Sequence, residues 1–111
     1  MQRVAKQQRD EGGLARFGEP GVLVLISLSD GAKHGYAITA DVLEQTGVRL
    51  GPGTLYGALS KLEERDLVTA LPAEDRRRPY EITEAGRSAL AAQLATWSRV
   101  VATGRARLAS S

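Results

Sequence analysis

The stretch Gly51–Arg65, GPGTLYGALSKLEER, decides the fold of this chain. Its leucines recur at intervals of four and three residues, which places them in one apolar stripe along a helix: Leu55, Leu59 and Leu62. Pro52 forces Gly51 into an extended conformation, so a helix cannot run through this turn. We therefore predict an amphipathic helix from about Thr54 to Arg65, with one face turned to a core and the other to solvent.

Two further helices are predicted upstream. Pro20 suits the first position of a helix, and residues 29–31, Ser-Asp-Gly, end the apolar run that follows it. A strand is the competing interpretation, because valine and isoleucine favour sheets. The proline start and glycine end favour a buried helix. The next helix is expected from about Tyr36 to Thr46, and Gly47 is expected to close it in the left-handed conformation.

A β-hairpin is predicted after these three helices. Residues 67–71 and 76–82 contain β-prone side chains, and the polar residues 72–75 form a turn between them. Pro79 cannot donate a hydrogen bond to a neighbouring strand, so its position is expected at a sheet edge.

A long helix is expected to close the chain. Thr83 is a favourable N-cap, and the helix should run from Glu84 to about Leu108. Apolar residues recur along it at intervals of four and three, which is the spacing of a coiled-coil seam. One helix cannot bury such a seam alone, so we expect a homodimer. The residues assigned to dimerisation are Leu90, Leu94, Trp97, Val101 and Leu108.

This order of elements is the layout of a winged helix-turn-helix, mainly α with a small β-hairpin, plus a long C-terminal dimerisation helix. Residues 1–19 form an N-terminal arm or helix. Residues 20–83 form the DNA-binding domain. Residues 84–111 form the dimerisation helix.

The fold predicts which side chains contact DNA. The second of the paired helices lies in the major groove, and its polar face offers Tyr56, Ser60 and Lys61. The hairpin is the wing, and its run of Arg76, Arg77 and Arg78 suits backbone phosphates, although a solvated charged turn is the alternative. Tyr36 is expected to be half-buried, with a hydroxyl that can reach a phosphate. His34 is expected as a turn residue or helix cap.

Composition limits the other functions. The 111 residues argue for one domain, and 15 basic against 13 acidic residues give a net charge of only +2. The absence of cysteine and the single histidine exclude disulfide scaffolds, cysteine zinc fingers and multi-histidine metal sites within one chain. No apolar run approaches the ~20 residues of a membrane helix, and the N-terminus does not resemble a signal peptide. We expect a cytoplasmic protein without metal, cofactor or membrane partner.

Four blocks of this sequence resemble the PadR family of transcriptional regulators over about residues 20–100. They are His34-Gly35-Tyr36-Ala37-Ile38, Pro52-Gly53-Thr54-Leu55-Tyr56, Leu59-Ser60-Lys61-Leu62-Glu63 and Tyr80-Glu81-Ile82-Thr83-Glu84-Ala85-Gly86. The chain is similar to the short subfamily with a single C-terminal helix.

The resemblance implies a dimeric repressor that binds a palindromic double-stranded DNA operator and releases it when a small ligand binds. It adds Thr54 to the DNA contacts and supports Tyr56. It also implies that residues 3–16 pack against the partner's C-terminal helix. Residues 97–100 resemble the branch of lactococcal multidrug-binding regulators, whose paired tryptophans line a drug pocket. Trp97 is therefore a candidate ligand contact, and packing alone is the other interpretation.

Three positions depart from the family pattern. Gly51 replaces a common serine, which removes a side-chain cap from the recognition helix. Gly57 replaces a common proline, and Asp66 replaces the usual glycine after this helix. These changes put the operator sequence in doubt but keep the DNA-contact chemistry.

Two other functions compete with DNA binding. An enzyme is disfavoured because the sequence shows no paired nucleophile and base, metal-ligand set or phosphate-binding loop. A winged helix that binds a protein instead of DNA is the main alternative, and Glu63 and Glu64 on the reading helix favour it. Tyr56, Ser60 and the arginine run argue against it.

Overall fold

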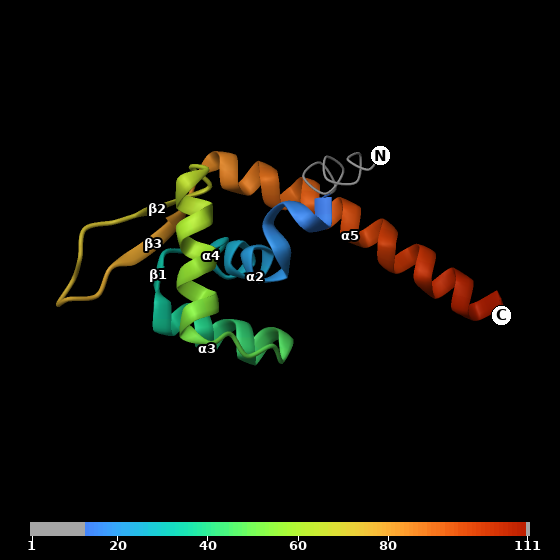
Figure 1. Ribbon diagram of the computed structural model, residues 1–111, viewed down its shortest axis with the longest axis horizontal. Helices are drawn as coiled ribbons and strands as arrows, with labels where there is room; N and C mark the ends of the chain where they lie inside the picture. The colour runs from blue at the N-terminus through green and yellow to red at the C-terminus, as the bar shows by residue number, and fades with distance from the viewer. Residues whose placement is uncertain (1–12, 111) are drawn as a thin grey trace, which may run out of the picture.

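The computed structural model describes the backbone of residues 13–110 and the side chains of residues 19–110. The elements are α2 (Gly13–Leu28), β1 (Lys33–His34), α3 (Gly35–Thr46), α4 (Pro52–Glu64), β2 (Val68–Ala70), β3 (Pro79–Ile82) and α5 (Glu84–Ser110). The hairpin of β2 and β3 projects from one side of the molecule, and α5 extends from the other (Figure 1). Among these helices, none combines the length and apolar character needed to cross a membrane.

Helix α2 begins seven residues earlier than the sequence predicted. Pro20 lies inside the helix instead of at its first position. Proline in a helix interior removes one backbone hydrogen bond and costs about 3 kcal/mol. The helix changes direction along its length (Figure 1), as expected when a proline interrupts the bonding ladder. The expected arm, residues 1–19, and the expected contacts of residues 3–16 lie mostly outside the described residues.

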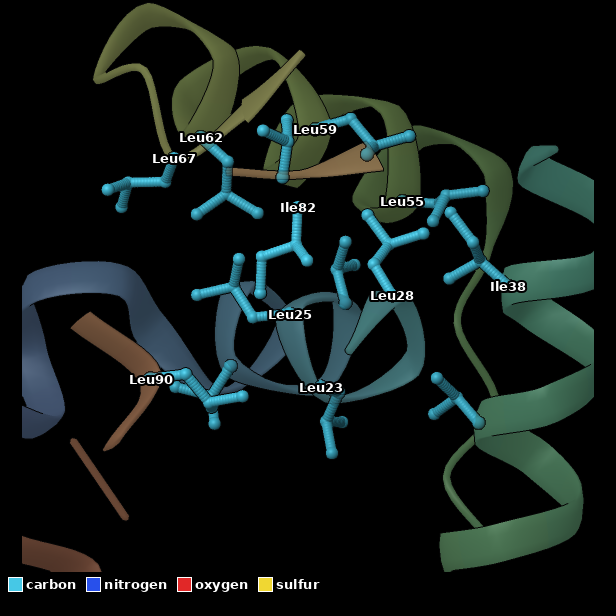
Figure 2. Close-up of a cluster of buried hydrophobic side chains, with 14 of the residues drawn as sticks. Leu23, Leu25, Leu28, Ile38, Leu55, Leu59, Leu62, Leu67, Ile82 and Leu90 are labelled. Atoms are coloured by element: carbon cyan, nitrogen blue, oxygen red, sulfur yellow. The ribbon is translucent and has the colours of Figure 1, made fainter. Parts of the chain in front are cut away.

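Helix α2 forms the centre of the core, which explains why it tolerates the proline. Val22, Val24, Leu25 and Leu28 are fully buried, and each such burial stabilises the fold by about 1.5–3 kcal/mol. Helices α3, α4 and α5 and strand β3 all contact α2. Figure 2 shows the buried side chains that these elements and their neighbours gather around it: Ile38, Leu55, Leu59, Leu62, Leu67, Ile82 and Leu90.

The boundaries of α3 and α4 follow from their first and last residues. Gly47 ends α3 with φ 78°, and its N–H bonds the carbonyl of Leu43 at 2.9 Å, so the predicted left-handed cap is confirmed. Helix α4 begins at Pro52, two residues before the predicted start, because proline suits the first helical turn. Gly51 is the N-cap and provides no side-chain hydrogen bond.

The sheet has three strands in the order β1-β3-β2, one more than the predicted hairpin. Strand β1 pairs antiparallel with β3, with His34 opposite Pro79. Strand β3 is therefore central, and the expected edge position of Pro79 is wrong. Pro79 is the first residue of β3, where its missing N–H is tolerated, and its carbonyl accepts a bond from Leu71 N at 2.8 Å.

The arginine run lies outside the strands. We call the hairpin of β2 and β3 the wing and residues 74–78 the wing tip. Glu74 and Arg77 exchange two backbone hydrogen bonds, which closes a two-residue turn. Asp75 and Arg76 have φ of 49° and 70° in that turn. Positive φ at both central residues is the geometry of the commonest tight hairpin turns.

Helix α5 is firmly joined to the winged helix. The Thr83 hydroxyl donates to the carbonyl of Asp66 at 2.8 Å and accepts from Gly86 N at 2.9 Å, which confirms the predicted N-cap. A Cβ on Gly86 would lie 2.1 Å from the carbonyl oxygen of Leu67, so only glycine fits against that backbone. The start of α5 is thus fixed by side-chain bonds and by close backbone contact.

Candidate DNA-binding surface

The polar face of α4 lies on the surface, as its periodicity predicted. Leu55, Leu59 and Leu62 are at most 2% exposed and face the core. The four predicted contact residues of this helix are all exposed: Thr54, Tyr56, Ser60 and Lys61. Lys61 lies in the last turn, where its charge is favourable for the helix dipole. The face combines hydroxyl groups and one cation, which can bond phosphates and base edges.

Tyr56 joins α4 to the start of α3. Its side chain is 51% exposed, and its hydroxyl lies so close to Gly35 that a Cβ there would stand 2.2 Å from that oxygen. Gly35 is buried and lets the ring approach the backbone. Tyr36 follows directly and is 79% exposed, so the expectation that it is half-buried is wrong. At the first turn of α3 it projects from the core, which leaves its hydroxyl open to a ligand.

Tyr80 of β3 is partly buried and packs against the core. The pKa of Tyr80 is raised mainly by burial, and further by the charges of Glu63 and Tyr56, while Arg78 lowers it. The other strand of the wing, β2, packs against α4. Strand alternation alone did not predict how the sheet packs against this helix.

The wing tip presents three exposed cations, Arg76, Arg77 and Arg78. They lie in and beside the tight turn, whereas the sequence interpretation placed them in the second strand. A turn projects its side chains outward, so the three guanidinium groups are available to bind an anion. Glu74 and Asp75 stand beside them and reduce the local positive charge.

His34 occupies the N-cap position of α3 with φ −77° and ψ 162°, but its side chain makes no capping hydrogen bond. The ring is directed elsewhere: Nε2 lies 3.3 Å from Oε1 of Glu74 at the wing tip. The prediction of a cap position is confirmed, and the contact with the wing was not predicted.

The seam of α5 divides into a buried part and an exposed part. Leu90 is 7% exposed and belongs to the core of its own chain. Leu94, Val101 and Leu108 are exposed, at 41%, 50% and 79%. Trp97 is partly buried and packs against the core. An open hollow of about 570 Å³ lies along this face, lined by Leu94, Trp97, Ser98, Val101, Ala102 and Arg105.

Comparison with known proteins identifies the family. Residues 22–92 match the model of the transcriptional regulator PadR-like family. An uncharacterised 37.1 kDa protein in transposon TN4556 of Streptomyces fradiae is 45% identical over 85 residues, which cover 77% of this chain. The chain spans about a quarter of that protein's length, since the match covers 25% of it.

Solved structures share the fold. A PadR family transcription regulator from Clostridium difficile superposes with a TM-score of 0.74 at 24% identity, covering 82% of this chain and 99% of that one. A PadR-like transcriptional regulator from Bacillus cereus superposes with a TM-score of 0.70 at 22% identity, covering 91% and 96%. The resemblance drawn from the four sequence blocks is therefore confirmed over most of the chain. The protein belongs to the PadR-like family of transcriptional regulators.

Proposed function

We propose that the chain acts as a dimeric repressor that binds a palindromic DNA operator through α4 and the wing. One observation carries this proposal: the hydroxyl of Tyr56, an exposed residue of α4, lies against Gly35 at the start of α3, next to the exposed Tyr36. Helices α3 and α4, whose residues were predicted to contact DNA, thereby meet at one side chain, and strand β2 of the wing packs against α4. The proposal assigns no catalytic role to the chain.

The α4 face and the wing have different roles in this proposal. Helix α4 enters the major groove, where Thr54, Tyr56 and Ser60 meet base edges and the adjacent backbone. Lys61 and the wing-tip arginines neutralise phosphates. Tyr36, exposed at the start of α3, adds a hydroxyl contact to the backbone. Phosphate contacts set affinity and position, and base contacts set the choice of operator.

A salt titration tests this assignment. Fluorescence anisotropy is measured with the intergenic DNA upstream of the protein's own gene and with an unrelated duplex, at several salt concentrations. The triple variant Arg76→Ala, Arg77→Ala, Arg78→Ala should weaken binding to both duplexes. The slope of log affinity against log salt should become shallower by about 0.9 for each phosphate that the variant no longer neutralises, and so by up to about 2.7.

Arg99→Ala is the matched control, because this exposed arginine lies on α5, away from the wing. It should leave the slope unchanged. An unchanged slope in the triple variant contradicts the phosphate role of the wing. If the unmodified protein binds neither duplex at low salt, the proposed DNA binding is wrong, and a protein partner is the alternative to test.

We further propose that the hollow on α5, closed by a second copy, takes a flat aromatic or drug-like ligand that releases DNA. Trp97 is the only tryptophan in the chain, so its fluorescence reports the hollow directly. Aromatic compounds that quench this fluorescence should also release the operator. Trp97→Ala should abolish most of the ligand affinity, because aromatic faces stack on flat ligands, while the dimer stays folded. Retained ligand affinity in this variant means that Trp97 only packs against the core.

A further inference from the structure

The His34 imidazole has an unusual environment. Its Nε2 atom is shielded from solvent and has no hydrogen-bond partner of good geometry. The carboxylate oxygen Oε1 of Glu74 lies 3.3 Å from it. A shielded ring nitrogen is costly without a partner, so this carboxylate is the group that can satisfy it with a small movement.

The histidine end of this contact is held in place by the sheet and by α2. Strand β1 pairs with β3 through Lys33 and His34. Lys33 also donates from Nζ to the carbonyl of Ser27 and to the carboxylate of Asp30, both at 2.5 Å. Its ammonium group lowers the pKa of Asp30. The backbone that carries the imidazole is therefore fixed to the C-terminal end of α2.

The glutamate end belongs to the closed turn of the wing tip. Arg77 N donates to the carbonyl of Glu74 at 2.8 Å, and Glu74 N donates to the carbonyl of Arg77. Glu74 and the tip arginines therefore form one closed turn. One described backbone hydrogen bond crosses the hairpin between this turn and the paired strands. It runs from Leu71 N to the carbonyl of Pro79. The Glu74 side chain adds a second link, from this turn back to His34 at the start of α3.

We propose that His34 and Glu74 are positioning residues for the wing: the imidazole at the start of α3 holds the Glu74 carboxylate, and so sets where Arg76–Arg78 stand relative to Tyr36. This inference rests on the proposed DNA binding. It explains why an acidic residue stands at a tip that is proposed to meet phosphates. The negative charge of Glu74 opposes DNA binding, and its contact with His34 keeps the arginines in place.

The test compares two variants of equal charge. Glu74→Gln and Glu74→Ala both remove the negative charge, but only glutamine keeps an acceptor within reach of His34. Glu74 is 69% exposed, so neither variant should disturb the core. Asp75→Asn removes a charge from the same tip without touching His34, and asparagine tolerates the positive φ at this position.

Two readouts separate the inference from the proposed function. In the free protein, the ¹⁵N heteronuclear NOE of the amides of Arg76–Arg78 should fall in Glu74→Ala and stay near the original value in Glu74→Gln. Operator affinity should be about threefold to tenfold lower for Glu74→Ala than for Glu74→Gln, the effect of one modest hydrogen bond. Asp75→Asn should bind DNA more tightly than the unmodified chain. In a His34→Ala background, the two Glu74 variants should become equal.

Equal NOE values in the two Glu74 variants overturn the inference. A difference in NOE with equal DNA affinity also overturns it, because the tip position would then not matter for binding. If the unmodified protein binds no DNA, the proposed function fails. The NOE comparison then shows whether His34 still orders the tip, and only the role in DNA binding is overturned.

Discussion

At the scale of single residues, the close approach of Tyr56 to Gly35 determines where the Tyr56 ring points. We predict that Gly35→Ala weakens operator binding by about tenfold while the chain stays folded. The added methyl group would lie 2.2 Å from the Tyr56 hydroxyl, which is the end of a movable side chain. The ring can swing away at modest cost in stability, about 1–3 kcal/mol, but it then leaves its position beside the start of α3.

The matched control is Gly53→Ala in the first turn of α4, where an added Cβ meets nothing within 4 Å. Anisotropy gives the DNA affinity, and thermal unfolding shows that each variant is folded. Unchanged affinity in folded Gly35→Ala protein would show that the position of Tyr56 is not important for DNA binding.

Residue roles were predictable where they depend on local spacing. The buried and exposed faces of α4 follow from its repeat of leucines, and Thr83 was identified as a cap from its type and place. Tyr36 was misjudged, because its exposure depends on how α3 packs and not on its neighbours in sequence. The contact of His34 with Glu74 joins residues forty positions apart. Nothing in either local sequence indicates it.

At the scale of elements, α4 carries a glycine on its exposed face. Gly57 lies in the helix interior, and an added Cβ there meets nothing within 4 Å. We predict that Gly57→Ala stabilises the fold by about 0.5–1 kcal/mol, because glycine is the less favourable helix residue. The same methyl group should weaken operator binding if the helix backbone approaches the DNA closely at this point. Calorimetry and anisotropy on the one variant measure both effects.

Ser60→Ala is the companion variant: it adds no bulk but removes a proposed hydroxyl contact from the same face, so it should also weaken operator binding. If the Gly57→Ala variant is more stable and binds the operator with unchanged affinity, α4 does not approach the DNA closely at this residue.

The elements themselves could be predicted unequally well. Helices α3, α4 and α5 were placed within two residues at each end, because each has a clear apolar period and a recognisable cap. The start of α2 was missed, since the burial of its valines and leucines outweighs the proline in its interior. Strand β1 has two residues and exists only through pairing with β3. A sequence window cannot detect a strand that short.

At the scale of the whole molecule, the exposed seam of α5 predicts self-association. Val100 and Val101 are adjacent and both are 50% exposed, but only Val101 lies on the seam and lines the hollow. We predict that Val101→Asp shifts the protein to monomer, because a charge at a paired helix seam is desolvated without a partner. Val100→Asp, the control, should remain dimeric. Sedimentation equilibrium measures both.

Operator affinity should fall strongly in the monomeric variant, since two linked half-sites bind much more tightly than one. If Val101→Asp and the unmodified chain have the same mass in solution, this face of α5 is not the dimer interface. The sequence predicted the seam from its spacing. It did not show that Leu90 belongs to the core of its own chain, because spacing cannot tell which partner a seam residue meets.

The fixed junction between Leu67 and Gly86 makes α5 a lever arm. A helix of 27 residues is about 40 Å long. If two such arms cross near Val101, about 25 Å from Glu84, a change of about 10° in their crossing angle displaces one winged helix relative to the other by about 4 Å, a little more than one base-pair step. Substitutions on the pairing face alone would then retune the distance between operator half-sites. New operator spacings can arise in this way while every residue that reads DNA stays the same.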